Sequence, residues 1–241
     1  MKSVARILLI SNSTVYGRDY LDHAENEIKR FLGRAKTLLF IPFALHDRDA
    51  YAAKAISRFA EMGYSVESAH TSKHPKEAIQ GTDAIFIGGG NTFRLLKTLQ
   101  DLELLEPIRL QVKAGAPYIG SSAGSNVGGP TIKTTKDMPI VQPRSFDSLG
   151  LVPFQISPHF QDPDPNSKHM GETQEERILQ FLEENETPVV GMREGAWLVC
   201  ENGAVILKGE TSARIFRRGE APIEARPGEN IVDLVGGPSA I

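Results

Sequence analysis

Short apolar segments alternate with longer amphipathic ones through the first half of this chain, and this alternation constrains its fold more than any other feature. The segments with the composition of β-strands are 7–11, 37–42, 64–69, 84–87 and 117–120. The stretches between them carry apolar residues at helical spacing, over 20–32, 47–62, 75–80 and 92–113, with a break expected near Asp101. The first, second and fourth strands are apolar on both faces, as in a parallel sheet that helices cover. This order predicts an α/β fold with a doubly wound, mostly parallel sheet and helices on both faces.

The second half of the chain has a different character. Seven of the 15 prolines fall between Pro130 and Pro165, so this stretch is expected to be mostly loop. A helix is predicted over 172–184 and a short strand over 189–191. Segments 197–200 and 204–207 flank an Asn-Gly turn and predict an antiparallel hairpin near the C-terminus, followed by an edge strand over 213–216. Because no linker is evident, we expect one domain over 1–241, with 226–241 as a tail that can fray.

Composition narrows the classes of partner. The net charge is −3 and no helix face concentrates Lys or Arg, which argues against nucleic acid. The single cysteine, Cys200, excludes an intrachain disulfide and favours a reducing, cytoplasmic location. The apolar run 7–10 is too short for a membrane span, and no His-Glu-x-x-His or Cys/His cluster is present. We therefore expect no membrane partner, no metal and no other cofactor.

Segment 120–124, Gly-Ser-Ser-Ala-Gly, matches the G-x-S-x-G pattern of a nucleophile elbow and follows a predicted strand. A sharp strand-to-helix turn strains its central residue and requires small neighbours, which this segment supplies. Such a turn would expose the Ser122 hydroxyl beside the backbone N–H of Ala123, which can bind an oxyanion. The alternative is a Gly/Ser-rich turn without chemistry.

A glycine loop, Gly88-Gly89-Gly90-Asn91, follows the strand at 84–87. Its spacing is not that of G-x-G-x-x-G, so a nucleotide cradle is weakly supported. We favour a second oxyanion donor, Gly89 or Gly90, facing the serine turn. A plain turn is the remaining alternative.

His159, in Ser157-Pro158-His159-Phe160, is the preferred general base for Ser122, because imidazole titrates near neutrality. His169 and His46 are its rivals. Two carboxylates compete to orient this histidine. Glu194 follows the strand at 189–191, whereas Asp137 lies between Ser122 and His159 in the chain, and sequence order does not decide between them.

Several long motifs, in the same order along the chain, resemble those of the peptidase E family of α-aspartyl dipeptidases. They are the glycine loop 88–93, the serine turn 120–126, Asp-Met-Pro-Ile-Val-Gln-Pro at 137–143, Pro-His-Phe at 158–160, Gly-Glu-Thr at 171–173 and Glu-Gly at 194–195. The resemblance covers nearly the whole chain. It implies a flavodoxin-like fold related to class I glutamine amidotransferases, which carry cysteine where this chain has serine.

The resemblance also implies a cytosolic serine peptidase that hydrolyses small peptide substrates, Asp-Xaa dipeptides, through a triad of Ser122, His159 and Glu194. Asp137 then becomes a substrate-binding or supporting group. Bacterial members carry arginine directly after Gly-Glu-Thr, whereas this chain has Gln174.

A pocket for N-terminal aspartate needs a cation for the β-carboxylate and an acceptor for the ammonium group. The candidate acceptors are Asn91, Asp137 and Glu172. The candidate cations are Lys133, Lys136, Arg144, Lys168 and Arg177. A cyanophycinase-like peptidase that cuts aspartyl-arginine units and a non-catalytic flavodoxin-like binding protein are the alternative functions. The sequence is compatible with a monomer or a homodimer.

Overall fold

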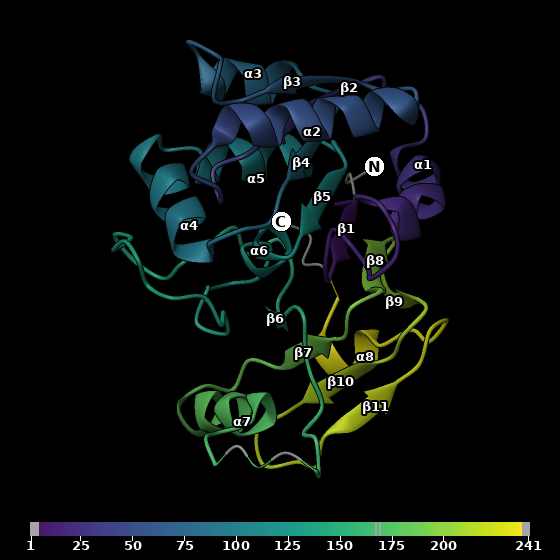
Figure 1. Ribbon diagram of the computed structural model, residues 1–241, viewed down its shortest axis with the longest axis vertical. Coiled ribbons are helices and arrows are strands. Elements are labelled where there is room, and N and C mark those ends of the chain that lie inside the picture. Colours follow the sequence, from purple (N-terminus) through teal and green to yellow (C-terminus); the bar gives the residue numbers. More distant parts are fainter. Residues whose placement is uncertain (1–4, 167, 169, 238–241) are drawn as a thin grey trace.

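The computed structural model describes residues 5–166, 168 and 170–237. Within them the larger sheet has seven strands in the order β3-β2-β4-β5-β1-β8-β9 (Figure 1). The parallel strands are β3 (Ser65–Ser68), β2 (Thr37–Ile41), β4 (Ala84–Ile87), β5 (Tyr118–Ser121) and β1 (Ile7–Ile10). The predicted hairpin, β8 (Ala196–Glu201) and β9 (Ala204–Gly209), extends this sheet antiparallel to β1. The predicted α/β fold with its mostly parallel sheet and C-terminal hairpin is confirmed.

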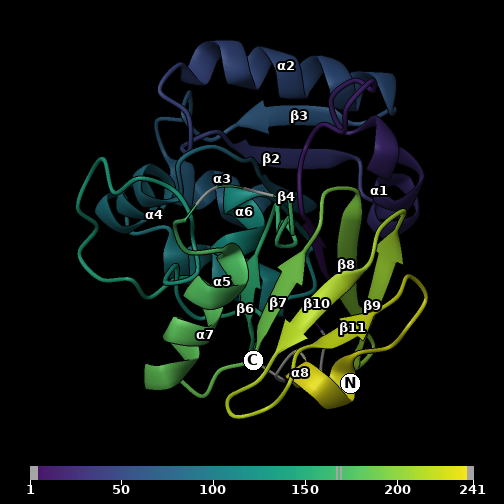
Figure 2. The same cartoon turned by 60° about the horizontal axis from the view of Figure 1, so that its bottom comes forward.

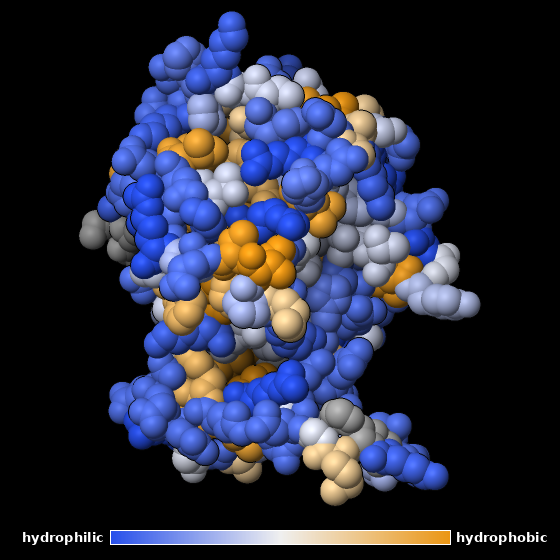
Figure 3. Space-filling view, turned by 60° about the vertical axis from the view of Figure 1, so that its left-hand side comes forward, coloured by the Kyte–Doolittle hydropathy of each residue, from blue (hydrophilic) through white to orange (hydrophobic). Residues whose placement is uncertain are grey.

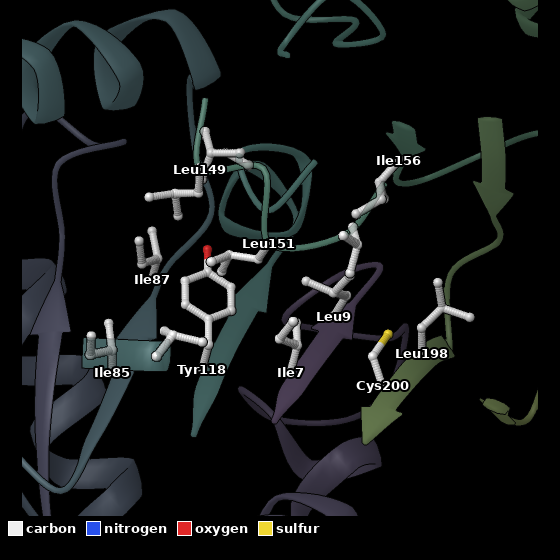
Figure 4. Close-up of a cluster of buried hydrophobic side chains, with 14 of the residues drawn as sticks. Ile7, Leu9, Ile85, Ile87, Tyr118, Leu149, Leu151, Ile156, Leu198 and Cys200 are labelled. Carbon is white, nitrogen blue, oxygen red and sulfur yellow. The ribbon is translucent and has the colours of Figure 1, made fainter. Parts of the chain in front are cut away.

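Each face of the larger sheet is covered by helices, because successive side chains of its strands point to opposite faces. Leu8 and Ile10 pack with α1 (Glu25–Leu32) and α2 (Arg48–Glu61) on one face. Ile7 and Leu9 pack on the other face (Figure 4), with the apolar residues of α3 (Pro75–Gly81), α4 (Thr92–Asp101) and α5 (Leu105–Lys113). The β1 and β4 strands are buried along their whole length, as their composition predicts.

Of two predictions about helices, one is confirmed by the structure and one is wrong. The break expected near Asp101 is present, because Glu103 adopts a φ of 53° between α4 and α5. The single helix expected over 20–32 is wrong. Leu21 has a φ of 62°, and a 3-10 turn, η1 (Asp22–Ala24), precedes α1. The Leu21 N–H donates to the Ser13 carbonyl, which turns the chain across the end of the sheet before the helix begins.

A second sheet, which the sequence pattern did not predict, lies beside the first (Figure 2). Its strands run in the order β11 (Ile223–Ala225), β10 (Ala213–Phe216), β7 (Val189–Met192) and β6 (Gln155–Ser157). The expectation of an edge strand over 213–216 is wrong, since β10 pairs with both β7 and β11. Helix α7 (Gln174–Glu184) packs on this sheet through Ile178 and Leu182.

The predicted tail is folded as far as the structure describes it. Ile231 and Val235 are buried, and the Ile231 N–H donates to the Val205 carbonyl at 2.8 Å. A short helix, α8 (Val232–Val235), packs against β9. The expectation of fraying therefore fails for 226–237, while 238–241 lie outside the described residues.

The strands of the larger sheet bring several loops to one edge. The loops that follow β1, β2, β4 and β5 meet at the carboxyl ends of these parallel strands, where ligands bind in open α/β sheets.

Across the described residues, no helix has the length and apolar character needed to cross a bilayer.

Candidate active site

Ser122 occupies a strained turn between β5 and α6 (Ala123–Asn126), with φ 53° and ψ −111°. The flanking glycines are required by close approach of the backbone. A Cβ on Gly124 would overlap the Ile87 carbonyl oxygen, and a Cβ on Gly120 would overlap the Gly124 carbonyl. The local sequence therefore forces a tight elbow that presents the serine side chain, as its pattern predicts.

Buried hydrogen bonds hold this elbow in place. The Tyr118 hydroxyl donates to the Gly124 carbonyl at 2.6 Å, and burial raises the pKa of Tyr118 far above its usual value, so the hydroxyl stays protonated. The Ser125 hydroxyl lies 2.7 Å from the Ile10 carbonyl and 2.8 Å from the Gly120 carbonyl. The elbow is thus fixed to both neighbouring strands, β1 and β5.

His159 reaches Ser122 from the loop that follows β6. Its Nε2 lies 2.9 Å from the Ser122 Oγ. The backbone holds a φ of 53° at His159, and its N–H donates to the Ser11 hydroxyl at 2.9 Å. The Ser11 hydroxyl in turn donates to the Met192 carbonyl, so strands β1 and β7 both position the imidazole. The Lys136 ammonium donates to the His159 carbonyl at 2.6 Å.

Glu194 contacts the other ring nitrogen of His159. Its Oε1 lies 2.8 Å from Nδ1, and the Thr211 hydroxyl holds the Glu194 backbone carbonyl at 2.7 Å. Asp137 lies elsewhere, with one carboxylate oxygen 2.7 Å from the Thr92 N–H and 2.6 Å from its hydroxyl. The contact expected between Glu194 and His159 is therefore present, and Asp137 anchors its own loop to the start of α4.

The glycine loop faces the serine turn directly. A Cβ on Gly89 would lie 2.9 Å from the Ser122 Cβ, and Gly90 has a φ of 133°. The Tyr51 hydroxyl lies beside Gly88 of this loop, and burial raises the pKa of Tyr51. The loop thus brings backbone amides beside Ser122, as expected for Gly89 and Gly90.

A cleft of about 620 Å³ opens above the serine. Ser122, His159, Gly89 and Gly90 form one end of it. The rest of its lining comes from the β1–η1 loop, the loop between β2 and α2, and the first turns of α2: Ser13, Tyr20, Leu45, His46, Asp47, Ala50, Tyr51 and Lys54. His46, which was one rival to His159 as the base, also lines this cleft, but among the described residues it makes no hydrogen bond to Ser122. The other rival, His169, lies outside the described residues. Sequence reasoning missed Tyr20, Tyr51 and Lys54, because nothing in a helical pattern marks a cleft wall.

A second, narrower pocket of about 160 Å³ lies between segment 133–137 and α7. Its cations are Lys133, Lys136 and Arg177, and Asp137 and Gln174 also line it. Burial lowers the pKa of Lys136, while Asp137 and Glu194 act in the opposite direction. Figure 3 shows this side of the molecule, where the surface is hollowed between the main body and the part that carries α7.

The remaining predicted substrate-binding residues already have protein partners. The Asn91 side chain caps α4 by accepting from the Arg94 N–H at 3.0 Å and donates to the Met138 carbonyl at 2.9 Å. Arg177 and Glu172 form an exposed ion pair at 3.7 Å. The structure therefore does not bring Glu172 or Arg177 into contact with Ser122, His159 or Glu194.

A serine on a strained strand-to-helix elbow, hydrogen-bonded to a histidine that also contacts a carboxylate, is the arrangement of hydrolases that form a covalent acyl-enzyme. The fold and this geometry are those of a serine hydrolase. The chain belongs to peptidase family S51, whose family model matches residues 7–208.

Relatives of known name agree with this assignment, and solved structures share the fold. Peptidase E of Streptomyces coelicolor is 49% identical over 229 residues, covering 95% of this chain and 94% of that protein. A probable alpha-aspartyl dipeptidase of Drosophila melanogaster is 42% identical, covering 94% and 96%. A putative peptidase E from Listeria monocytogenes superposes with a TM-score of 0.65 at 22% identity over 86% of this chain and 99% of that one. A peptidase from an acI-B1 actinobacterium gives 0.73 at 18% identity over 95% and 97%. The two structures support the fold alone.

Proposed function

We propose that this protein is a serine peptidase that hydrolyses dipeptides with an N-terminal aspartate, and that Ser122, His159 and Glu194 form its catalytic triad. The observation that carries the proposal is the continuous chain from the Ser122 Oγ to His159 and on to the Glu194 carboxylate, at 2.9 and 2.8 Å. The substrate class is supported by the names of the relatives, among them an alpha-aspartyl dipeptidase at 42% identity.

The geometry supports an acyl-transfer mechanism. The His159 Nε2 accepts the Ser122 proton as the Oγ attacks the scissile carbonyl carbon. The negative charge that develops on the carbonyl oxygen is taken by backbone N–H groups of Ala123 and the glycine loop. Within the glycine loop the donor is Gly89 or Gly90, both of which line the cleft together with Ser122. His159 then protonates the leaving amine, and a water molecule hydrolyses the acyl-enzyme by the reverse proton path.

Glu194 orients the imidazole in this mechanism. A hydrogen bond from the Nδ1–H to the Glu194 carboxylate selects the tautomer with a free Nε2 and stabilises the imidazolium that forms. The Glu194 side chain is 54% exposed, so solvent screens part of this stabilisation. We therefore assign Glu194 mainly to orientation of the ring.

The aspartate side chain requires a cation, and this chain has Gln174 where the resemblance to the peptidase E family leads us to expect an arginine. We place the β-carboxylate toward the narrow polar pocket, with Lys136 as its cation. Lys136 lines that pocket and contacts the His159 backbone, whereas Arg177 already pairs with Glu172 and Arg144 lies 3.6 Å from Asp101. Asp137 and Asn91 support this pocket by fixing segment 135–138 to α4.

The decisive experiment measures release of leucine from Asp-Leu by chromatography. The wild-type protein should release it, and Ser122→Ala should reduce turnover by about 10⁶, the loss typical of a triad nucleophile. Ser121→Ala is the matched control, because Ser121 is the preceding residue and its buried hydroxyl has no described hydrogen-bond partner. Near-normal turnover by folded Ser122→Ala would exclude the serine mechanism. Cleavage of a polymer of aspartyl-arginine units, with Asp-Leu left intact, would favour the cyanophycinase-like alternative.

A further inference from the structure

Lys54 stands out among the residues of the cleft that holds Ser122 and His159. It lies on α2, exposed to solvent, with its Nζ 4.7 Å from the centroid of the Tyr20 ring. Other lysines of the molecule form ion pairs, as Lys29 does with Glu25 and Lys97 with Asp101. In the part of the chain that the structure describes, no carboxylate lies within 4.0 Å of the Lys54 ammonium. A cation without a protein counter-ion therefore faces the cleft.

Tyr20 forms part of the cleft wall beside Lys54. Its hydroxyl oxygen is buried next to the Tyr51 hydroxyl, and burial holds the pKa of Tyr20 well above its usual value, so the group stays neutral. Tyr20 therefore supplies no charge that would neutralise the Lys54 ammonium.

The acid of the cleft wall does not neutralise Lys54. The Asp47 carboxylate accepts the Ala50 N–H at 2.9 Å and caps α2. The Lys54 ammonium therefore keeps its positive charge available to a ligand, and a carboxylate is the group that such a charge binds.

The leaving residue of the substrate is the part that reaches this end. His159 must protonate the leaving amine, so the second residue of the dipeptide lies on the side of His159, in the cleft that both His159 and Lys54 line. Leu45, Ala50 and the Tyr51 ring supply apolar walls that accept a variable side chain. The narrow pocket is lined by other residues, and we assign its cations to the aspartate side chain.

We propose that Lys54 binds the C-terminal carboxylate of the dipeptide, so that this part of the cleft selects substrates two residues long. The proposal rests on the proposed function, because it assigns the second carboxylate of the same substrate. The two carboxylates of an Asp-Xaa dipeptide are thereby divided between two lysines, Lys54 and Lys136.

The test compares kcat/KM for Asp-Leu with that for its amide, Asp-leucinamide. A charge-assisted contact of this kind corresponds to a preference for the free acid of roughly 10- to 100-fold in the wild type. Lys54→Met should reduce the ratio toward 1, and Lys54→Arg should retain part of it because it keeps the charge. Lys113→Met, at the end of α5 and outside the cleft lining, is the matched control and should leave the ratio at the wild-type value.

A reciprocal comparison makes the assignment specific. Lys136→Met should reduce the preference for Asp-Leu over Asn-Leu while the acid-to-amide ratio is retained, and Lys54→Met should do the opposite. The inference is overturned if Lys54→Met changes both substrates of the acid–amide pair equally, or if it reduces the Asp–Asn preference instead. If the wild type releases no leucine from any of these compounds, the proposed function fails, which is a different result from an unchanged ratio in an active Lys54→Met enzyme.

Discussion

At the scale of single residues, Glu194 and Asp137 show that the partners of a carboxylate determine its role. Glu194 contacts the His159 ring, while the Asp137 carboxylate receives the N–H and hydroxyl of Thr92. Asp137 and Glu194 each lie in one of the motifs that resemble the peptidase E family, so membership of a motif does not distinguish their roles. Their partners do, because a carboxylate that orients an imidazole affects turnover and one that fixes a loop affects stability.

Glu194→Gln should therefore lower kcat by roughly 10²–10⁴, because the amide can no longer favour the tautomer with a free Nε2. The thermal unfolding midpoint should change little, since the side chain is half exposed. Asp137→Asn is the comparison and should lower the unfolding midpoint more than kcat. Steady-state kinetics and calorimetry on both variants check this, and an equal loss of kcat in the two would contradict the assignment.

At the scale of elements, the strand–elbow–helix unit of β5 and α6 depends on glycine for steric reasons. Gly124 packs against the Ile87 carbonyl of β4, which leaves no room for a Cβ. Helix α6 is only a short turn, so the elbow is held by this close approach and by the Ser125 and Tyr118 hydroxyls. A methyl group at position 124 would push α6 away from the sheet and displace Ser122.

Gly124→Ala should accordingly abolish hydrolysis or prevent recovery of folded protein. Overpacking against backbone typically costs about 1–3 kcal/mol, and more where nothing can move aside. Gly81→Ala is the control, because Gly81 ends α3 and an added Cβ there meets nothing within 4 Å. Soluble expression, unfolding midpoint and Asp-Leu turnover are measured for both. A fully active Gly124→Ala protein would mean that the elbow tolerates displacement.

At the scale of the whole molecule, the Arg193 side chain ties together the parts that carry His159 and Glu194. Its guanidinium group binds Asp162, in the loop after β6, at 2.6 and 2.7 Å and Glu224, on β11, at 2.7 Å. The hydrogen bond from Arg193 holds the pKa of Asp162 below its usual range. A depressed folded-state pKa stabilises the protein fully above the unfolded pKa of about 4, and this contribution is lost as pH falls through the folded value.

The difference in unfolding midpoint between wild type and Asp162→Asn should therefore be constant above about pH 5 and shrink below about pH 4. Glu220→Gln removes an exposed pair with Arg217 within one turn and should have a small effect at every pH. Thermal melts from pH 7 to 3 test this. A wild-type advantage over Asp162→Asn that grows on acidification would have the wrong sign and would refute the role of this ion pair.

The sequence by itself determined the features that are fixed locally. Buried strands such as β1 and β4, the Asn202-Gly203 hairpin turn and the elbow at Ser122 follow from side-chain polarity and from backbone sterics between near neighbours. Ser122 could be singled out for the same reason. His159 could be preferred from its sequence context, but the choice of Glu194 over Asp137 needed more, namely the resemblance of several separate motifs to one family.

Only the tertiary structure decided how distant segments meet. Strand β7 pairs with β6 on one side and with β10 on the other, and this second sheet carries His159 and Glu194 to the place where Ser122 follows β5. The cleft wall of Tyr20 and Lys54 likewise arises because the β1–η1 loop packs beside α2. Such pairings depend on the summed packing of residues far apart in the chain, which no local pattern encodes, whereas strand polarity and glycine sterics act within a few residues.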